Sequence, residues 1–570
     1  MSSAPPAGNF TDTGNATVTS GAWDFLGPLQ DMDFLWLELQ LVGSAMGIIY
    51  LGAHASLRRP PSAAPPKDKK TGKTKKEDDN FTQGLELGDA IMFPLMAGCV
   101  LVGLYYLIQY LKDPAILTTI LKYYMSTVSV ASMVTLYAHG MDLVTSFVFP
   151  KYWRGRDGRL RKAVQGEQKA VTCDDAGNVV DQQTESNPLP WILGIFAPTA
   201  KSKAFAWKLR NLLTRNWLFR IYLRGAGEEK TTIKFVTVLA IPVSAITAFF
   251  YFTTNLPFLS NMLGYGMCYC SLLILSPTDL MIGSLVLVGL FFYDIVMVFY
   301  TPYMVTVATT LDVPIKLTFK AAGRQSILGL GDIVIPGMVM AWTLRLDLWL
   351  FYQRKIKYES RELSIVEKTA SGEIVTRSDS KHMEIKAPYV DVKGRWGDRW
   401  WSSALFSRTV LPAEIAATQF PKTYFHATLT GYLAGMIVTL AMLLVFKRGQ
   451  PALLYLVPGV LGSIYTTALF RGELKKIWRY TEDGSLDTTD VIVEVDGQGN
   501  STKTIGVLKD GVVDTTKTDD EKTKEKEKAD EEKEKKERQE RDDKEKKEAL
   551  AKKGYSVFSV TLDVPPEDEE

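Results

Sequence analysis

Long apolar runs alternate with strongly charged segments along the whole chain. The runs from Met281 to Phe292 and from Leu433 to Phe446 contain no charged residue. Because a helix needs about 20 mostly apolar residues to cross a bilayer, this pattern predicts an all-α polytopic membrane protein with nine transmembrane helices. The predicted spans are residues 34–57, 89–111, 121–149, 232–252, 256–275, 280–300, 327–351, 424–446 and 452–470.

The average composition hides this segregation. The 570 residues include 66 Lys and Arg against 64 Asp and Glu, for a net charge of +2, and 46% are hydrophobic. A near-neutral charge gives no reason to expect nucleic acid as a partner. Lys and Arg collect mainly after the odd-numbered spans, which predicts a luminal N-terminus and a cytosolic C-terminus. Two connections argue weakly the other way, since Lys447 and Arg448 follow the eighth span and Lys316, Lys320 and Arg324 follow the sixth.

Polar segments separate the groups of spans. The expected organisation is a luminal leader at 1–33, transmembrane helices 1–3 at 34–149, a cytosolic insertion at 150–231, transmembrane helices 4–7 at 232–351, a second cytosolic insertion at 352–420, transmembrane helices 8–9 at 421–471 and a charged, largely disordered cytosolic tail at 472–570. The leader carries N-x-T triplets at Asn9 and Asn15, which are candidate N-glycosylation sites.

Two of these segments carry local patterns. Aromatic and aliphatic residues are interleaved with bases from Lys201 to Arg224, which favours an amphipathic helix, either in the membrane interface or packed on the helix ends. In the tail, alternation over Val491 to Val495 and over Thr504 to Leu508 predicts a β-hairpin. The Lys/Glu/Asp segment from Lys517 to Lys553 has too few apolar residues to form a core, so we expect disorder or a solvated helix.

Two carboxylates fall inside the apolar runs. Asp294 lies deep in the sixth span and Asp332 at the start of the seventh. An ionised group at mid-membrane costs about 2.5–3.5 kcal/mol on insertion scales. If the two helices are neighbours, the carboxyl groups can share a proton and hold a water, with one acting as general base and the other as general acid. This is the chemistry of an aspartic protease, for which water is the only cofactor.

Other interpretations of the two carboxylates stay open at this point. Each carboxyl could remain protonated and bond a neighbouring backbone. The pair could serve a proton- or cation-coupled transporter or channel, although no internal repeat is apparent. An inactive membrane scaffold could retain the same fold. A metalloprotease is disfavoured, because the four histidines are scattered and no H-E-x-x-H motif occurs.

The surroundings of the carboxylates suit a peptide substrate. Gly329 and Gly331 flank Leu330 immediately before Asp332, and they would let a substrate backbone approach closely. Two prolines, Pro451 and Pro458, lie at the start of the ninth span, so this backbone should be partly unwound with free hydrogen-bonding groups.

Three motifs in this order resemble those of the GxGD-type intramembrane aspartyl proteases of the presenilin-like superfamily, and of the signal peptide peptidase family in particular. They are Tyr293-Asp294, Gly329-Leu330-Gly331-Asp332 and Pro451-Ala452-Leu453. The flanking segments LGLGDIVIPG, VTVATTLDVPIKL and QPALLYLVP are more similar to signal peptide peptidase than to presenilin.

The resemblance implies a nine-helix fold in which Asp294 and Asp332 are catalytic. Tyr293, Gly329 to Gly331 and Gln450 to Leu453 would shape the active site. The implied activity is metal-free cleavage of remnant signal peptides and type II membrane anchors within the endoplasmic reticulum membrane. The implied partners are these membrane-embedded peptides, the lipid bilayer and a homo-oligomer or quality-control complex.

Two features qualify the resemblance. The short leader lacks the large luminal domain of the signal-peptide-peptidase-like branch, and the final residues from Pro565 to Glu570 are not a dilysine retrieval signal.

The connection from Val305 to Leu317 is rich in Val and Thr, and it could be either an ordinary loop or an edge strand for an unwinding substrate. In the second case, Val313, Ile315 and Leu317 would form the template.

Overall fold

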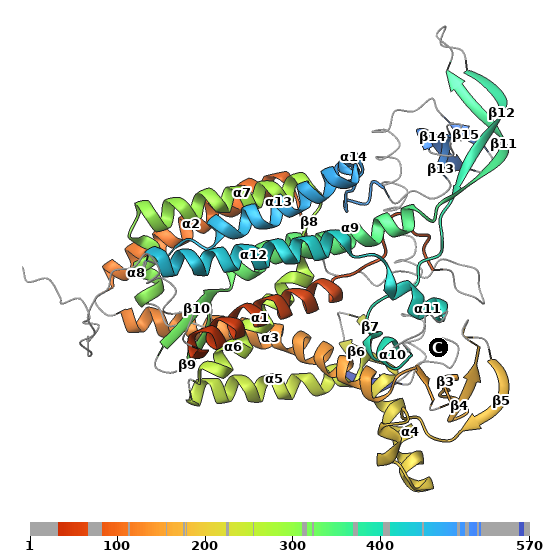
Figure 1. Ribbon diagram of the computed structural model, residues 1–570, viewed down its shortest axis with the longest axis horizontal. Helices are drawn as coiled ribbons and strands as arrows, with labels where there is room; N and C mark the ends of the chain where they lie inside the picture. Colours follow the sequence, from red (N-terminus) through yellow and green to blue (C-terminus); the bar gives the residue numbers. More distant parts are fainter. Residues whose placement is uncertain are drawn as a thin grey trace, which may run out of the picture.

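The computed structural model shows an elongated bundle of long helices, with most of the β-strands gathered at one end (Figure 1). The structure describes residues 32–66, 83–111, 114–155, 157–174, 177, 179–223, 227–254, 256–310, 316–321, 324–368, 374–402, 411–446, 450–486, 491–495, 501–509, 512–514 and 558–563. Asn9, Asn15 and the segment from Lys517 to Lys553 lie outside the described residues.

Every predicted span corresponds to a long helix. These helices are α1 (Met32–Ala55), α2 (Leu87–Tyr110), α3 (Pro114–Val148), α5 (Phe235–Thr254), α6 (Pro257–Ile274), α7 (Leu280–Ile295), α9 (Gly331–Gln353), α12 (Thr423–Phe446) and α13 (Leu453–Arg471). Among the described residues, seven helices are long and apolar enough to cross a membrane, and α3 and α6 are not in that set. Both contain many Ser, Thr, Tyr, Gly or Asn residues, which lower their hydropathy.

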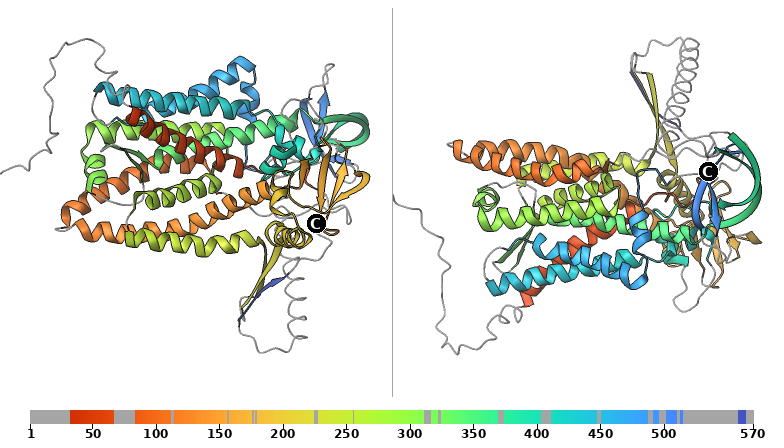
Figure 2. Two further views of the ribbon diagram at one scale, coloured as in Figure 1. Left: turned by 60° about the horizontal axis from the view of Figure 1, so that its bottom comes forward. Right: turned by 90° about the horizontal axis from the view of Figure 1, so that it is seen from above.

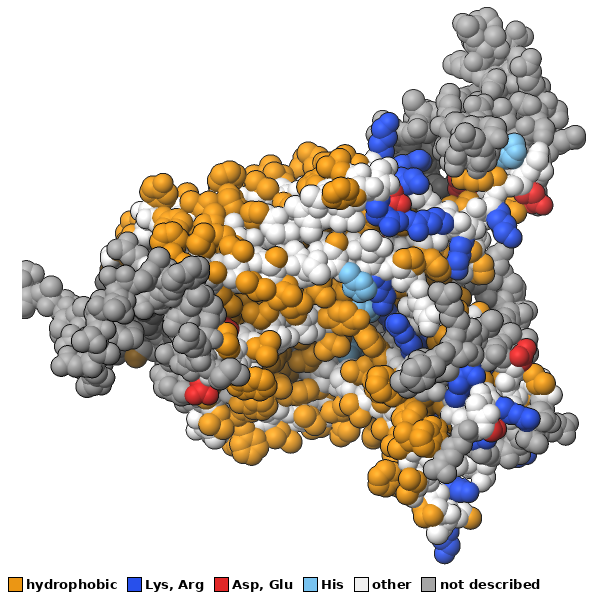
Figure 3. All heavy atoms as spheres, in the orientation of Figure 1, with side chains coloured by type: hydrophobic (Ala, Val, Ile, Leu, Met, Phe, Trp, Pro, Cys, Tyr) orange, Lys and Arg blue, Asp and Glu red, His pale blue; other side chains and the backbone are white. Residues whose placement is uncertain are grey.

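Helix α9 runs through the centre of the bundle. In its most apolar 18-residue window 89% of the residues are buried, against none in the corresponding window of α2. Apolar side chains cover the outer face of the bundle in a broad band (Figure 3), as expected for helices surrounded by lipid. The helix that carries Asp332 is therefore held on all sides by protein, while α2 presents its surface outward.

The segment between α3 and α5 is built mostly of strands. Strands β2 (Tyr152–Arg154), β3 (Leu160–Val164), β4 (Lys169–Cys173) and β5 (Val179–Glu185) form an antiparallel sheet, which is followed by η2 (Leu193–Phe196), α4 (Ala200–Thr214), β6 (Asn216–Leu223) and β7 (Gly227–Lys234). The amphipathic helix expected from Lys201 to Arg224 is therefore too long, since it ends at Thr214. The residues after it pair with β7 and with the distant β16 (Phe558–Asp563), an interaction that helical periodicity does not reveal.

One face of α4 packs on protein. Trp207 is 2% exposed, lies against Trp153 and Ala163 of the neighbouring sheet, and donates a hydrogen bond from Nε1 to the carbonyl of Ser186 (2.9 Å). One face of α4 thus packs on the sheet, while Phe205 of the same helix is 66% exposed, and its location in the membrane interface stays a prediction.

The other polar segments also form strands and short helices. They contain β11 (Lys357–Lys368), β12 (Ile374–Ile385), α10 (Trp396–Ser402), α11 (Ala413–Ala416), η4 (Ala417–Gln419), α14 (Leu474–Arg479), β13 (Val491–Val495), β14 (Ser501–Lys509) and β15 (Val512–Asp514). Strands β11 to β15 close into a small barrel (Figure 2). The hairpin predicted in the tail is confirmed as the antiparallel pair β13 and β14.

Two small sheets lie within the bundle itself. Strand β1 (Gln83–Leu85) pairs in parallel with β8 (Leu275–Pro277), and β9 (Lys316–Ala321) pairs antiparallel with β10 (Arg324–Gly329). The second pair lies at the end away from the barrel (Figure 1). It connects α8 (Tyr303–Thr310) to α9, so β10 leads directly into the Gly-Leu-Gly-Asp sequence.

Candidate active site

Asp294 lies near the end of α7 and is 4% exposed. Its Oδ2 accepts a hydrogen bond from the backbone N–H of Leu453 (3.2 Å). Directly after Ile295 the helix changes to a π-helix, η3 (Val296–Tyr300). Such π-turns within helices are often found at functional sites. The wider turn here follows immediately on the carboxylate that the sequence singled out.

Asp332 lies in the first turn of α9. Its carbonyl oxygen accepts a hydrogen bond from the hydroxyl of Tyr432 on α12 (3.3 Å). The side chain interacts electrostatically with the carboxyl group of Asp294. The carboxyl groups of Asp294 and Asp332, 38 positions apart in the sequence, thus lie near enough for their charges to interact.

The Pro-Ala-Leu segment approaches Asp294 through its backbone. Pro451 is buried and precedes α13, which begins at Leu453. The first N–H groups of a helix have no partner within the helix, and here the one of Leu453 points at the carboxylate. Gln450 and Ala452 are half-buried beside it. A backbone donor at the start of a helix suits a negative charge.

Glycine at position 329 leaves space beside the carboxyl group of Asp332. A Cβ placed on Gly329 would lie 3.3 Å from Oδ2 of Asp332, closer than most Cβ contacts, whereas one on Gly331 would meet only Ile335 at 4.0 Å. Leu330 between them is buried against Gly264 of α6. Tyr293 is half-buried, and its ring lies against Gly98 of α2, so it forms part of the wall between α2 and α7.

Among the described residues, the β9–β10 hairpin has one edge bonded to a neighbouring side chain and one edge with no strand beside it. Leu317 is completely buried, and the N–H and C=O of the next residue, Thr318, both bond to the side chain of Asn261 (2.8 Å each). The N–H and C=O of Thr318 therefore point away from β10. Residues opposite each other in an antiparallel pair share this orientation, so the N–H and C=O of its partner Ile327 point away from β9. The side chain of Ile327 is 50% exposed. Leu317 was expected to lie on an edge strand for the substrate, but the backbone of its neighbour Thr318 is already bonded to Asn261. The open edge of the hairpin belongs to β10. Val313 and Ile315 lie outside the described residues.

Two residues in this region were not predicted from sequence. Glu38 of α1 is 7% exposed and hydrogen-bonds to the side chain of Ser326 on β10, while its Oε2 has no hydrogen-bond partner among the described residues. Its position as a lone carboxylate in the first apolar run was a usable signal. Asn261 gave no such signal, because only the fold shows that its amide completes the edge of β9.

A third aspartate, Asp347, is also buried in α9. Its carboxyl oxygens accept hydrogen bonds from the backbone N–H groups of Tyr424 (3.2 Å) and Phe425 (2.9 Å), at the start of α12. Both interactions satisfy donors that a helix N-terminus leaves unpaired. Asp347 therefore has a structural role as a cap supplied from another helix.

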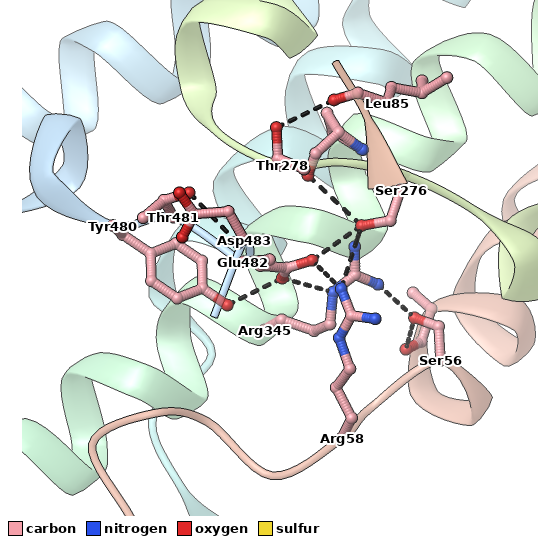
Figure 4. Close-up of polar contacts among 12 residues, drawn as sticks. Ser56, Arg58, Leu85, Ser276, Thr278, Arg345, Tyr480, Thr481, Glu482 and Asp483 are labelled. Atoms are coloured by element: carbon pink, nitrogen blue, oxygen red, sulfur yellow. Dashed lines mark hydrogen bonds and ion pairs between the residues drawn. The ribbon is translucent and has the colours of Figure 1, made fainter. Parts of the chain in front are cut away.

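A polar network is centred on the carboxylate of Glu482 (Figure 4). Glu482 accepts hydrogen bonds from Arg345 Nε, the Ser276 hydroxyl and the Tyr480 hydroxyl, each at 2.8 Å, and it also pairs with Arg58. Burial disfavours the charged carboxylate, but the two arginines together keep the pKa of Glu482 below its usual range. This network joins the segment after α1, strand β8, helix α9 and the segment after α14.

The described residues thus form a multi-pass membrane protein with a carboxyl pair between α7 and α9. They contain no cluster of three or more His, Cys, Asp or Glu side chains that could hold a metal ion.

The family model for signal peptide peptidase matches residues 75–484 of the chain. The chain belongs to the signal peptide peptidase family.

Individual relatives agree with this assignment. The chain is 33% identical over 246 residues to intramembrane protease 2 of Caenorhabditis elegans, covering 42% of this chain and 41% of the relative. It is 24% identical over 415 residues to a probable intramembrane protease of Saccharomyces cerevisiae, covering 69% and 60%. Human signal peptide peptidase is 26% identical over 321 residues, covering 54% and 67%. The chain therefore matches less than two thirds of the first two relatives, and no solved structure gave a significant match.

Proposed function

We propose that this protein is an intramembrane aspartic endopeptidase in which Asp294 and Asp332 activate water to hydrolyse a peptide bond within a transmembrane segment. The observation that carries the proposal is the pairing of these two carboxyl groups, with the Leu453 N–H directed at one of them. The names of the relatives, intramembrane protease and signal peptide peptidase, support the same class of reaction.

The contacts also divide the roles between the two carboxyl groups. The N–H of Leu453 stabilises negative charge on Asp294, so we assign Asp294 as the general base. It takes a proton from water as the water oxygen bonds to the scissile carbonyl carbon. Asp332, protonated, donates its proton to the carbonyl oxygen. Collapse of the resulting diol breaks the C–N bond, and a carboxyl proton passes to the leaving amine.

The substrates we propose are remnant signal peptides and type II membrane anchors in the endoplasmic reticulum membrane. The distribution of Lys and Arg supports nine spans with a luminal N-terminus and a cytosolic C-terminus. In this orientation Asn9 and Asn15 are on the side where N-glycosylation occurs. The reaction needs no metal or organic cofactor.

The open edge of β10 supports a mode of substrate binding. An unwound substrate segment could pair with the outward-facing backbone of Ile327, which lies five residues before Asp332. Ile327→Pro removes the N–H that would bond the substrate. We expect it to reduce cleavage strongly while binding of a small aspartic-protease transition-state analogue persists. Ile327→Val, which keeps the N–H, is the matched control, and equal loss of cleavage in both variants would contradict this mode.

The activity itself is tested with a labelled signal-peptide-like transmembrane peptide. Purified protein in detergent is incubated with the peptide, with Asp332→Ala prepared in parallel, and the products are identified by mass spectrometry. We expect the unmodified chain alone to cleave within the apolar segment. Absence of cleavage by a folded, unmodified chain, or equal cleavage by Asp332→Ala, would refute the proposal.

A further inference from the structure

A large cavity lies where the helix bundle meets the strand-rich segments. Its volume is about 1070 Å³, and its lining comes from α1, α3, α6, β3, α4, β7 and α10. A smaller cavity adjoins it, since His54, Lys393 and Trp396 line both. We refer to the two together as the basic cavity. It is separate from the carboxyl pair, none of whose residues line it.

The lining of the basic cavity carries an excess of positive charge. It includes nine Lys or Arg side chains and three Asp side chains. Two of the aspartates already have partners: Asp142 bonds Lys234 (2.8 Å), and Asp398 accepts the backbone N–H groups of Lys151 and Tyr152. Glu414, outside the lining, pairs with Lys151 and Arg395, so three of the nine bases have a carboxylate partner among the described residues, and an excess of positive charge remains on the others.

Lys422 and Arg399 show the excess most clearly. The Nζ of Lys422 contacts Nε2 of His54 (2.9 Å). Among the described residues, no ion pair with a carboxylate is recorded for Lys422 or for Arg399. Burial, followed by the charge of Arg399, lowers the pKa of Lys422 to about 8. Lys162, from β3, is also half-buried, with its Nζ over the ring of Tyr152. The neighbouring positive charges of Lys422 and Arg399 favour a bound anion.

Part of the lining of the basic cavity is apolar. Leu51 of α1, Leu136 and Leu143 of α3 and Leu273 of α6 line it, and all belong to long helices of the bundle. On the molecular surface, Lys and Arg side chains gather at the edge of the apolar band (Figure 3). A ligand that fills this space must combine an anionic group with hydrocarbon.

We propose that the basic cavity binds a phospholipid with a phosphorylated headgroup, whose phosphate groups contact basic side chains of the lining, including Lys162 in the larger cavity and Arg399 and Lys422 in the smaller one, and whose acyl chains extend toward Leu51, Leu136 and Leu273. Arg and Lys bind phosphate oxygens with charge-assisted hydrogen bonds, and a basic pocket at the membrane surface is a recognised form of lipid site. The apolar side distinguishes this site from one for a free phosphate. The proposal does not depend on protease activity.

The test uses the full chain, purified in a nonionic detergent. Its thermal unfolding and its binding by native mass spectrometry are measured with three probes: dioctanoyl phosphatidylinositol 4-phosphate, dioctanoyl phosphatidylcholine and inositol 1,4-bisphosphate, which is the headgroup without chains. The test variant is Lys162→Gln/Lys422→Gln, in which Gln keeps a donor for His54. The matched control is Lys475→Gln/Lys476→Gln, which removes the same charge from exposed positions of α14 outside the cavity.

We expect the phosphorylated lipid to bind and stabilise the protein, with affinity reduced roughly tenfold or more in the cavity variant and unchanged in the control. Asp332→Ala should bind it normally. Equal binding of phosphatidylcholine, or full affinity in a folded cavity variant, would overturn the proposal. If inositol 1,4-bisphosphate bound as tightly as the lipid, the site would be one for a soluble phosphate and the lipid assignment would be wrong.

Discussion

Two groups of acidic side chains differ in how fully their carboxyl oxygens are bonded. Glu482 receives four hydrogen bonds or ion pairs, from Arg345, Arg58, Ser276 and Tyr480. Asp294 receives one backbone hydrogen bond, and among the described residues none is recorded to the carboxyl oxygens of Asp332. The two sites are joined by α9, whose residues 332 and 345 are roughly 20 Å apart along the helix axis.

This difference separates a structural acid from a reactive one. A buried carboxylate whose oxygens are fully hydrogen-bonded or ion-paired holds its neighbouring helices and strands in place. It has no free capacity to accept a proton from water. A carboxyl pair with few hydrogen-bond donors retains that capacity, and such groups are concentrated at functional sites. The comparison predicts that substitutions at Asp294 and Asp332 affect chemistry, whereas those at Glu482 affect folding.

The largest effect is expected for Asp294→Asn. The amide oxygen can still accept the Leu453 N–H, but the side chain can no longer take a proton from water. Peptide cleavage should fall by at least about 100-fold, while the unfolding temperature in detergent stays close to that of the unmodified chain. Initial rates and thermal unfolding measured on the same preparation check this. Near-normal cleavage would show that Asp294 is not the base.

Glu482→Ala should have the largest effect on stability. It leaves Arg345 and Arg58 without their carboxylate, and breaking a buried ion pair in this way costs about 3–5 kcal/mol. Denaturant titration or thermal unfolding would measure the loss. A loss of less than about 1 kcal/mol would mean that water replaces the carboxylate, and that the network does not hold the structure.

The same network should make stability depend on pH. Because the pKa of Glu482 is lower in the folded than in the unfolded state, its contribution is complete above the ordinary glutamate pKa of about 4.3. It is lost as the pH falls below that value toward the lowered native pKa. Unfolding should therefore become easier in mild acid, and Glu482→Gln should reduce this dependence. An unchanged pH profile in the variant would assign it to other groups.

Gly329→Ala is expected to act on chemistry with an intermediate effect. The added methyl group would lie 3.3 Å from Oδ2 of Asp332, so the carboxyl group must shift by a few tenths of an ångström. We expect cleavage to fall roughly tenfold, since misplaced catalytic groups lose rate steeply. Gly462→Ala, where the methyl group meets nothing within 4 Å, is the control. Equal activity of the two variants would show that the space beside Asp332 is not critical.

The smallest effect is expected for Asp347→Ala, which removes the cap from the start of α12. Loss of a helix cap costs about 1 kcal/mol, and turnover per folded molecule should not change. Unfolding and cleavage assays together distinguish this result from a catalytic role. A selective loss of cleavage would add Asp347 to the reactive group.

Much of the fold follows from the sequence because long apolar runs are an intrinsic property of the chain. Each predicted span forms a helix, and Asp294 and Asp332 stand out because a charge inside an apolar run is costly. Their meeting depends on the packing of α7 against α9, which the motifs imply only by resemblance. The role of Leu453 could be anticipated from Pro451, since a proline there leaves backbone donors free.

Other features depend on contacts between distant residues. Glu482 lies in a polar segment and looks like an ordinary solvent-exposed acid until Arg345 and Arg58 surround it. Strand β6 was expected to be helical, and its partner β16 lies more than 300 positions later. The closed edge at Thr318 depends on Asn261, which comes from another helix. No local pattern contains this information.

The most direct test of the account measures turnover per folded molecule for the unmodified chain, Asp332→Asn and Glu482→Gln in parallel. A labelled signal-peptide-like transmembrane peptide is the substrate, and the folded fraction is determined for each preparation. We predict that Asp332→Asn is fully folded and inactive, whereas Glu482→Gln is less stable but cleaves normally once corrected for folding. Cleavage by Asp332→Asn at the rate of the unmodified chain would contradict the assignment of the carboxyl pair as the catalytic centre.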